Sequence, residues 1–303
     1  MLKKVIVILE KESSNKETDE FVKVLHREGI DCVRYIAERE NGEKEIIDES
    51  DNRIEEILQE LDEHVSGKNY ETLFISSNPD ICLLAIEGGC SCIAYIGCVE
   101  DRSFGGIRYA IESLENIDID YLDKICRRYA GLPWKILETE RCIVREMTVE
   151  DVDAFYEIYK EPSITAYMEG LYPEREQETD YIKSYIKNIY EFYEYGLWTV
   201  VEKQSREIIG RAGISWREET ETVELGYVIA KPFQRQGYAY EVCNAILKYA
   251  YEELEIEQVA AYIKEGNEAS EALCRKLKFE QKENVIIKNA SYEKWLTILA
   301  KNK

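Results

Sequence analysis

Histidine is nearly absent from this sequence, which has only two among its 303 residues. Both of them, His26 and His64, lie in the first 138 residues. The rest of the chain therefore has no imidazole that could act as a base near neutral pH or bind a metal ion. A histidine base and a histidine-ligated metal are excluded from residues 139–303.

Long apolar runs and an excess of basic residues are also missing. No run of about 18 apolar residues is present, so we expect neither a transmembrane helix nor membrane association. The apolar start, Val5 to Leu9, ends at Glu10 and is too short for a signal peptide, which favours a buried first strand. The net charge is −22, from 39 basic and 61 acidic residues. Such a field repels nucleic acid, whereas it attracts a cationic amine.

The nine cysteines lack the context of a disulfide framework, since their number is odd and no secretory signal is present. We therefore expect reduced thiols and a cytoplasmic location. Cys82, Cys90, Cys92 and Cys98 lie near one another in the sequence, but without the spacing of a common metal site. We predict buried cysteines that act as small hydrophobic residues, and no bound metal.

The first part of the chain alternates strand and helix patterns. This alternation predicts a small parallel α/β sheet covered by helices over residues 1–134. Gly131-Leu132-Pro133-Trp134 is a linker signal that ends this domain. The expected strands are 5–9, 32–36, 73–75 and 93–96, and the expected helices are 18–28, 52–64, 79–87 and 121–134.

A different pattern follows the linker and predicts a second domain of α+β type with a mixed sheet over residues 140–303. Thr148 is the expected N-cap of a helix over 149–159, and Asp151 lies in its first turn, where the helix dipole favours acidic groups. The other expected helices are 176–195, 236–253 and 267–278. The expected strands are 141–146, 197–202, 208–216, 222–230, 258–263 and two within 285–299.

The most informative segment is the strand, turn and helix over residues 223–239. Its turn has the pattern Gln-x-x-Gly-x-Ala, formed by Gln234, Gly237 and Ala239. A helix start presents unpaired N–H groups and favours anions, and a glycine lets a pyrophosphate approach the backbone closely. The segment therefore predicts a phosphate-binding turn. The alternative is a plain strand-to-helix turn with a convenient glycine.

This segment resembles the acetyl-CoA-binding signature of the GNAT superfamily. A second similarity lies in residues 267–279, where the family helix usually reads Asn-x-x-Ser, then Leu-Tyr, then Lys-Leu-Gly-Phe. The resemblance covers roughly residues 140–300 and is greatest to the branch with the ribosomal-protein N-terminal acetyltransferases, whose opening is similar to Arg145-Glu146-Met147-Thr148. The matching residues of the second segment are Asn267, Ser270, Leu273, Lys276, Leu277 and Phe279.

The resemblance implies an N-acetyltransferase that moves an acetyl group from acetyl-CoA to a primary amine, either a protein N-terminus or a small amine. Val228 and Ile229 would offer strand backbone to the pantetheine arm, and Asn267 would hydrogen-bond the same arm. The phosphate-binding turn would hold the pyrophosphate through backbone amides; its residues are Gln234, Arg235, Gln236, Gly237, Tyr238 and Ala239.

Two residues are candidates for the acid–base chemistry that the resemblance implies. Glu224 lies on the strand before the phosphate-binding turn and is the candidate base; the alternative is an exposed strand carboxylate. Cys274 stands where the family often has a tyrosine as general acid. Its thiol could serve as the general acid instead of the tyrosine, or Cys274 could simply be a buried hydrophobic residue. In the latter case solvent or a tyrosine would supply the proton. Lys278 stands where the family usually has glycine. The tyrosines considered are Tyr167, Tyr172, Tyr193 and Tyr195.

The first domain loosely resembles the last catalytic segment of haloacid-dehalogenase-like hydrolases, through Leu73 to Ile81 and the strand at Ile93. Those enzymes need an aspartate after the first strand, where this chain has Glu10-Lys11-Glu12, and Ser77 replaces another expected aspartate. Longer glutamates would not reproduce the Mg²⁺ geometry. The resemblance therefore implies a degenerate, inactive relative, for which ligand binding, substrate contact and homodimer formation stay open.

Two other functions are compatible with the same sequence. One is a non-catalytic sensor that binds acyl-CoA, in which Cys274 marks lost chemistry. The other is a phosphatase-like enzyme in the first domain with an accessory second domain. Turnover of acetyl-CoA with amines, or Mg²⁺-dependent phosphatase activity, would distinguish these functions.

Overall fold

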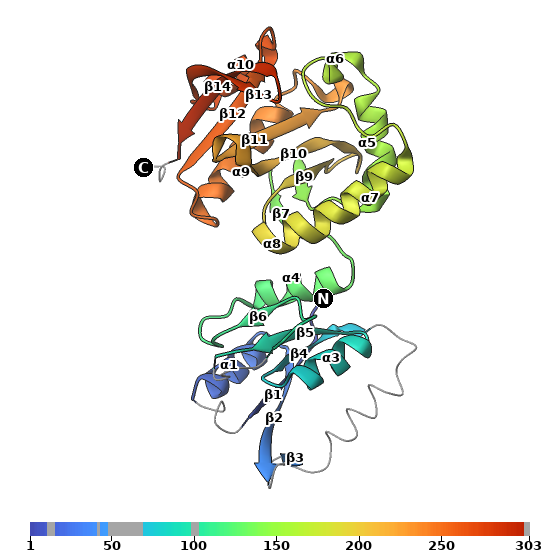
Figure 1. The fold of residues 1–303 in the computed structure, drawn as a ribbon, viewed down its shortest axis with the longest axis vertical. Coiled ribbons are helices and arrows are strands. Elements are labelled where there is room, and N and C mark those ends of the chain that lie inside the picture. Colours follow the sequence, from blue (N-terminus) through green and yellow to red (C-terminus); the bar gives the residue numbers. More distant parts are fainter. Residues whose placement is uncertain (11–15, 41–42, 48–68, 98–102, 300–303) are drawn as a thin grey trace. The chain divides into compact units, whose positions relative to one another are not determined.

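The structure, a computed structural model, describes residues 1–10, 16–40, 43–47, 69–97 and 103–299 of the chain. It divides into two compact units, Met1–Leu132 and Pro133–Lys303 (Figure 1). The domains expected from the sequence were 1–134 and 140–303. The structure instead places residues 133–139 in the second unit. The predicted helix over 52–64 lies outside the described residues.

The first unit contains a six-stranded sheet in its described residues, in the order β3-β2-β1-β4-β5-β6. All neighbouring strands are parallel except β3, which is antiparallel to β2. The predicted parallel α/β fold is therefore confirmed, with an antiparallel strand added at one edge. The strands are β1 (Lys4–Glu10), β2 (Asp31–Glu40), β3 (Glu43–Ile47), β4 (Asn69–Ser76), β5 (Cys90–Tyr95) and β6 (Ala110–Ile111).

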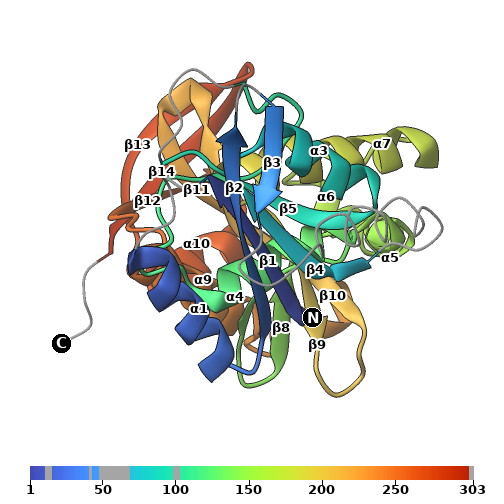
Figure 2. The same cartoon turned by 90° about the horizontal axis from the view of Figure 1, so that it is seen from below.

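Helices cover both faces of this sheet (Figure 2). One apolar cluster joins the central strands to α1 (Lys16–Arg27) and α4 (Ile119–Tyr129), and a second joins their opposite face to α3 (Pro79–Glu87). Burial on two faces explains why the strands are continuously apolar in the sequence. The predicted helix over 79–87 has the bounds of α3, whereas the one over 121–134 is shorter and begins earlier as α4.

The second unit is built on an eight-stranded sheet in the order β13-β14-β12-β11-β10-β9-β8-β7. Only β11 and β12 are parallel, so the predicted mixed sheet is confirmed. The strands are β7 (Lys135–Glu138), β8 (Cys142–Arg145), β9 (Leu197–Glu202), β10 (Ile208–Arg217), β11 (Thr222–Ile229), β12 (Gln258–Lys264), β13 (Glu280–Ile287) and β14 (Ala290–Ile298).

The second unit has one large apolar core and a smaller apolar cluster, to which α5, α6 and the end of β11 contribute. The helix predicted over 176–195 is observed as an unbroken helical run from Arg175 to Tyr193, in which Ile186–Tyr190 form a π-helix. The α-helices are α5 (Val152–Tyr159), α6 (Pro162–Thr165), α7 (Arg175–Tyr185), α8 (Glu191–Tyr193), α9 (Tyr238–Glu252) and α10 (Glu268–Lys276).

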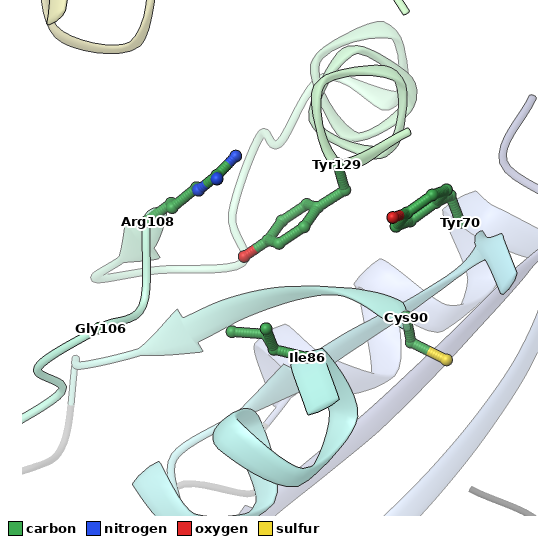
Figure 3. A pocket seen from close by; sticks show the side chains of 6 residues that line it. All are labelled: Tyr70, Ile86, Cys90, Gly106, Arg108 and Tyr129. Atoms are coloured by element: carbon green, nitrogen blue, oxygen red, sulfur yellow. The ribbon is translucent and has the colours of Figure 1, made fainter. Parts of the chain in front are cut away.

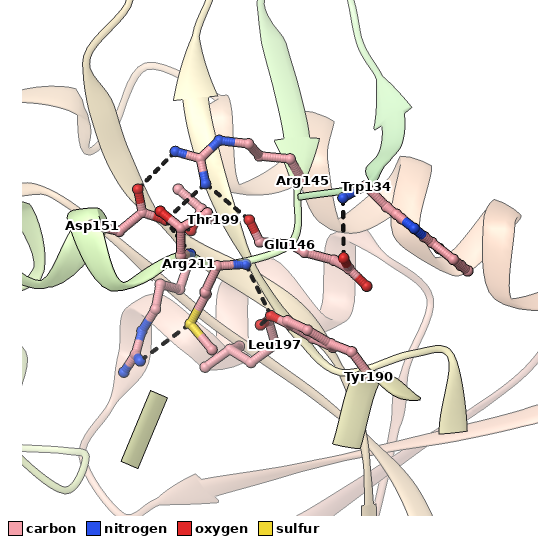
Figure 4. Close-up of polar contacts among 10 residues, drawn as sticks. Trp134, Arg145, Glu146, Asp151, Tyr190, Leu197, Thr199 and Arg211 are labelled. Atoms are coloured by element: carbon pink, nitrogen blue, oxygen red, sulfur yellow. Dashed lines mark hydrogen bonds and ion pairs between the residues drawn. The ribbon is translucent and has the colours of Figure 1, made fainter. Parts of the chain in front are cut away.

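A buried polar network joins β8 to the start of α5 (Figure 4). The guanidinium of Arg145 binds both carboxylate oxygens of Asp151 at 2.7 Å, and Thr199 donates to Asp151 at 2.8 Å. The predicted N-cap Thr148 precedes a short 3₁₀ helix, Val149–Asp151, and donates its N–H to Asp151 at 3.0 Å. Asp151 is therefore fully engaged in holding the segment that leads into α5.

Candidate functional site

The predicted phosphate-binding turn lies at the start of α9. Gly237 is the N-cap of the helix, at φ 87°, a left-handed conformation that glycine adopts without strain. The first helical hydrogen bond runs from the N–H of Glu241 to the carbonyl of Gly237 at 3.0 Å. The N–H groups of Tyr238, Ala239 and Tyr240 precede that bond, and a glycine has no side chain to cap them. The turn thus presents free amide dipoles to an anion.

The preceding residues shape this turn. Arg235 also has a left-handed φ, 60°, so left-handed residues stand on both sides of Gln236. Such turns direct neighbouring N–H groups into one concavity that suits an anion. Residues 235–237 are exposed, so a ligand can reach them. The side chain of Gln236 donates to the carbonyl of Pro232 at 2.6 Å, which ties the turn to the residues before it.

Strand β11 separates from β12 just before this turn. Their pairing is recorded at a single position, Glu224 opposite Ala260. A Cβ on Gly210 of β10 would lie 2.0 Å from the carbonyl oxygen of Val228, so that carbonyl faces β10. Because backbone groups alternate along a strand, those of Ile229 face the opposite edge, toward β12. Gln234 donates to the carbonyl of Ile229 at 2.8 Å, so its side chain lies at this edge.

Glu224 lies where β11 and β12 begin to separate. Its side chain is 16% exposed and accepts hydrogen bonds from the guanidinium of Arg217 at 2.5 Å. Burial raises the pKa of Glu224 above its ordinary value, although Arg217 acts in the opposite direction. The carboxylate is therefore not the exposed strand residue of the alternative reading, and it can accept a proton at a higher pH than an ordinary glutamate.

The two faces of β11 have different neighbours. Val228 packs with Ile158, Tyr159 and Ile164 of α5 and α6. Glu224 is four residues away and shares that face of the strand. Tyr227 lies on the other face, where its hydroxyl donates to Ser270 of α10 at 2.9 Å.

Asn267 caps α10, since its side-chain oxygen accepts the N–H of Ser270 at 3.2 Å. Its amide nitrogen is the part that is left to donate to a pantetheine arm. Cys274 of the same helix is 1% exposed, and burial raises its pKa to about 12. These surroundings favour the buried hydrophobic residue over the general acid.

The four tyrosines that the sequence brought forward lie in different places. Tyr167 donates its hydroxyl to the carbonyl of Gly266 at 3.0 Å, directly before Asn267. Tyr193 and Tyr195 stack near Phe192 of α8, whose side chain is 76% exposed. The ring of Tyr172 stacks on that of Tyr181. Of the four, Tyr167 is therefore the one that contacts the loop before Asn267, a predicted acetyl-CoA contact.

The first unit lacks a clear counterpart of this site in its described residues. Ser76 and Ser77 are fully buried at the carboxyl end of β4, and Ser76 donates to the carbonyl of Ile8 at 2.9 Å. Lys11 and Glu12, which follow the first strand, lie outside the described residues, as does Cys98. The eight described cysteines are free thiols, and all except Cys32 are buried.

A cavity of about 200 Å³ lies elsewhere in the first unit (Figure 3). It opens at the amino ends of β4 and β5, whereas open α/β sheets bind ligands beyond the carboxyl ends of their strands. We assign no ligand to it. Its lining residues are Tyr70, Ile86, Cys90, Gly106, Arg108 and Tyr129.

The described parts of both units contain neither a metal-binding cluster nor a helix that could cross a membrane. No group of three or more histidine, cysteine, aspartate or glutamate side chains there is arranged to hold a metal ion. No helix there combines the length and the apolar character that crossing a membrane requires.

Sequence reasoning missed two arginines of the site. Arg217 reaches Glu224 only through the β10–β11 hairpin, in which it lies opposite Thr222. Arg141 reaches the start of α9 from the residue before β8, about 100 positions away in the chain. The register of the hairpin would have indicated the position of Arg217, but no local sequence pattern indicates that of Arg141.

Comparisons with known proteins match the second unit. The family model described as an acetyltransferase (GNAT) domain matches residues 141–280. The uncharacterized N-acetyltransferase YoaA of Bacillus subtilis (strain 168) is 30% identical over 155 residues, which cover 50% of this chain and 85% of YoaA. The uncharacterized protein YkkB of the same organism is 31% identical over 144 residues, or 46% of this chain and 83% of YkkB.

A solved structure, the ribosomal-protein-S5-alanine acetyltransferase of Vibrio fischeri, is 15% identical and superposes with a TM-score of 0.47 over 54% of this chain and 95% of its own. The resemblance of the first unit to haloacid dehalogenases gains no support from any of these matches and stays a prediction. Through its match to the GNAT domain model and its 30% identity to the N-acetyltransferase YoaA over 85% of that protein, the chain belongs to the GNAT family and is an N-acetyltransferase.

Proposed function

We propose that this N-acetyltransferase binds acetyl-CoA at the start of α9 and along the free edge of β11, and that it acetylates a primary amine. The main support is the left-handed Gly237, which leaves the first amides of α9 uncapped in an exposed turn. Two phosphates of a nucleotide carrier suit such a turn, because they gain from the helix dipole and from several N–H donors at once.

The separation of β11 from β12 supports a path for the pantetheine arm. The backbone of Ile229 faces this edge, and because its carbonyl already accepts a bond from Gln234, an extended arm could pair with its N–H as an added strand would. Asn267 lies at the start of α10, which follows β12, and retains its amide nitrogen for the same arm. In this proposal Val228 serves through its strand backbone, while its side chain packs toward α5.

The chemistry is direct attack of the amine on the thioester. The amine nitrogen forms a bond to the carbonyl carbon, and the carbon–sulfur bond breaks to release the CoA thiolate. The amine must lose a proton, and Glu224 is the proposed acceptor, because it lies near the split between the strands and has a raised pKa. Arg217 holds its carboxylate in place.

The proton for the leaving thiolate has a different proposed source. A thiol with a pKa of about 12 is a much weaker acid than an ordinary thiol of pKa about 8.5, so Cys274 would give its proton to a thiolate only at a large cost. We therefore favour solvent, or Tyr167 beside Gly266, as the donor.

The acceptor amine is the open part of the function. Residues 139–303 carry 22 basic and 31 acidic side chains, a net charge of −9, which attracts a cationic acceptor. Peptides with a free N-terminus come first, given the similarity in sequence to the ribosomal-protein branch. A panel of such peptides, polyamines and aminoglycoside-like amines, with detection of free CoA, would identify the class.

Gly237→Glu tests the proposed acetyl-CoA site. A glutamate there would force a side chain into left-handed backbone and place a negative charge before the amides, so we expect the Kd for acetyl-CoA to rise roughly a hundredfold or more. Isothermal titration calorimetry on the full chain measures this. Gly131→Glu is the matched control, because Gly131 has φ 69° and open space around it. Equal affinity of Gly237→Glu and the wild type would reject the site.

The sensor function has one observation in its favour, the replacement of a usual tyrosine by the buried Cys274. The same amine panel distinguishes the sensor from the acetyltransferase. Tight binding of acetyl-CoA without release of CoA on any acceptor would favour the sensor, whereas turnover with one acceptor class would exclude it.

A further inference from the structure

The start of α9 is held by an arginine from a distant part of the chain. Arg141 immediately precedes β8, and its guanidinium lies 4.0 Å from the centre of the Tyr238 ring. The same group donates to the carbonyl of Gln236 at 3.1 Å and binds the carboxylate of Glu241 at 2.7 Å. Its backbone N–H donates to the other carboxylate oxygen of Glu241 at 2.8 Å. One side chain thus contacts the turn, the first residue of the helix and its first turn.

The ion pair with Glu241 also affects the charge at the start of α9. Burial alone would raise the pKa of Glu241, but hydrogen bonds from Thr139 and Arg141 outweigh it and lower that pKa below the ordinary value. The carboxylate is therefore ionised near neutral pH. A negative charge in the first turn of α9 would weaken the attraction of the free amides for an anion. Arg141 offsets that charge at the point where the turn needs to attract phosphate.

The geometry also fixes the shape of the turn. A Cβ added to Gly237 would lie 3.5 Å from a guanidinium nitrogen of Arg141, so the arginine lines the space that the glycine leaves open. Arg235 and Gly237 both have left-handed backbone, and the side-chain bond from Gln236 to Pro232 is the local restraint on them. The carbonyl of Gln236, between those residues, is the atom that Arg141 holds.

We propose that Arg141 is a positioning residue for acetyl-CoA: it locks the phosphate-binding turn and cancels the charge of Glu241, so that the turn attracts the pyrophosphate. The inference rests on the proposed acetyl-CoA site and adds an element from outside the strand–turn–helix motif. Arginine suits this role better than lysine, because its planar fork binds the carboxylate and the carbonyl at the same time.

The test is the Kd for acetyl-CoA of the full chain, measured by calorimetry at low and high salt. We expect Arg141→Gln to bind roughly tenfold more weakly at low salt, because Glu241 then faces the phosphates without its partner. The difference should shrink at high salt, where exposed charges are screened. Arg141→Lys should fall between Arg141→Gln and the wild type, because it restores the charge without the fork.

A double-mutant cycle separates the charge from a loss of packing. Glu241→Gln removes the anchor and the repulsion together, so we expect it to weaken binding by only about two- to threefold. The double variant Arg141→Gln/Glu241→Gln should bind more tightly than Arg141→Gln alone. Arg175→Gln is the matched control, since it breaks another two-point arginine–carboxylate pair, with Asp153 at 2.8 Å and 3.2 Å, and should leave the Kd unchanged.

The proposal is overturned if Arg141→Gln binds within about twofold of the wild type, or if the double variant binds no better than Arg141→Gln. Melting curves of all variants show whether a substitution affects the turn alone or the stability of the whole second unit. Glu241→Gln keeps the test valid if Arg141→Gln does not fold. A wild-type chain without affinity for acetyl-CoA would instead contradict the proposed function, so the two failures are distinguishable.

Discussion

Glu224 is the residue at which the pH dependence of the reaction should be decided. Burial raises the pKa of its carboxyl group. A base works only when it is ionised, so the rate should increase as the pH rises through this raised pKa. Glu224→Gln should remove that increase and lower kcat by about a hundredfold or more, while the Kd for acetyl-CoA stays the same. The profile of kcat/KM against pH, with an accepted amine, is the measurement.

Glu219→Gln is the control for this experiment. Glu219 also lies near Arg217, at 3.9 Å, but is 44% exposed. Its negative charge contributes to the raised pKa of Glu224, so its variant should retain kcat while the rise of the pH profile moves to lower pH. A Glu224→Gln enzyme with an unchanged profile would show that another group, or water, takes the proton from the amine.

Single residues could be placed from the sequence when the backbone itself demands them. Gly237 was predicted because only a residue without a side chain suits an anion-binding turn, and it has the positive φ that this role favours. Arg217 and Arg141 could not be predicted, because they reach the site through strand register and through packing. Asn267 lies between these cases: its position was predicted, whereas its role as the cap of α10 was not.

At the scale of elements, the end of α10 explains the unusual Lys278. The N–H of Phe279 bonds to the carbonyl of Cys274 at 2.9 Å, and that of Lys278 to Arg275 at 3.1 Å, which is the Schellman arrangement. Lys278 has φ 65°, the left-handed conformation for which the family usually supplies glycine. We expect Lys278→Gly to increase the free energy of unfolding by roughly 0.5–1 kcal/mol, the relief of left-handed strain less the added chain entropy.

Ala272→Gly provides the opposite case in the same helix. Ala272 is exposed in the helix interior, where glycine should lower the free energy of unfolding by about 1 kcal/mol. Urea denaturation of both variants and the wild type measures the two effects. If both glycines destabilise alike, Lys278 carries no strain and the helix end does not explain its place in the sequence.

Other elements show where periodicity stops being informative. The strand over 197–202 was predicted with its observed bounds, because it is rich in apolar, aromatic and β-branched residues. The helix over 176–195 was predicted without a change of helix type, because a single π-helical turn is rare and no residue pattern marks it here. Its cause is tertiary: Tyr190 is fully buried, donates to the carbonyl of Leu197 at 2.5 Å and accepts the N–H of Met147 at 3.2 Å.

At the scale of the molecule, the sequence indicated two different architectures but not their registers. Alternating strands and helices predict a parallel sheet, and the change of pattern after residue 134 predicts a mixed one. The boundary between the two units is harder to predict, because β7 is short, has exposed ends and lacks a clear alternation of apolar and polar residues. It was therefore left outside both expected domains, although it pairs with β8 in the sheet of the second unit.

The last prediction uses this boundary. The proposed acetyl-CoA site and Glu224 belong entirely to the second unit, so a fragment of residues 133–303 should fold and bind acetyl-CoA within about threefold of the full chain. A fragment of residues 140–303 loses β7 and Trp134, which is 4% exposed and exchanges two hydrogen bonds with Glu146. Removing so large a buried side chain should cost roughly 3 kcal/mol or more of stability. Urea denaturation compares the two fragments, and equal stability would show that the second unit does not depend on residues 133–139.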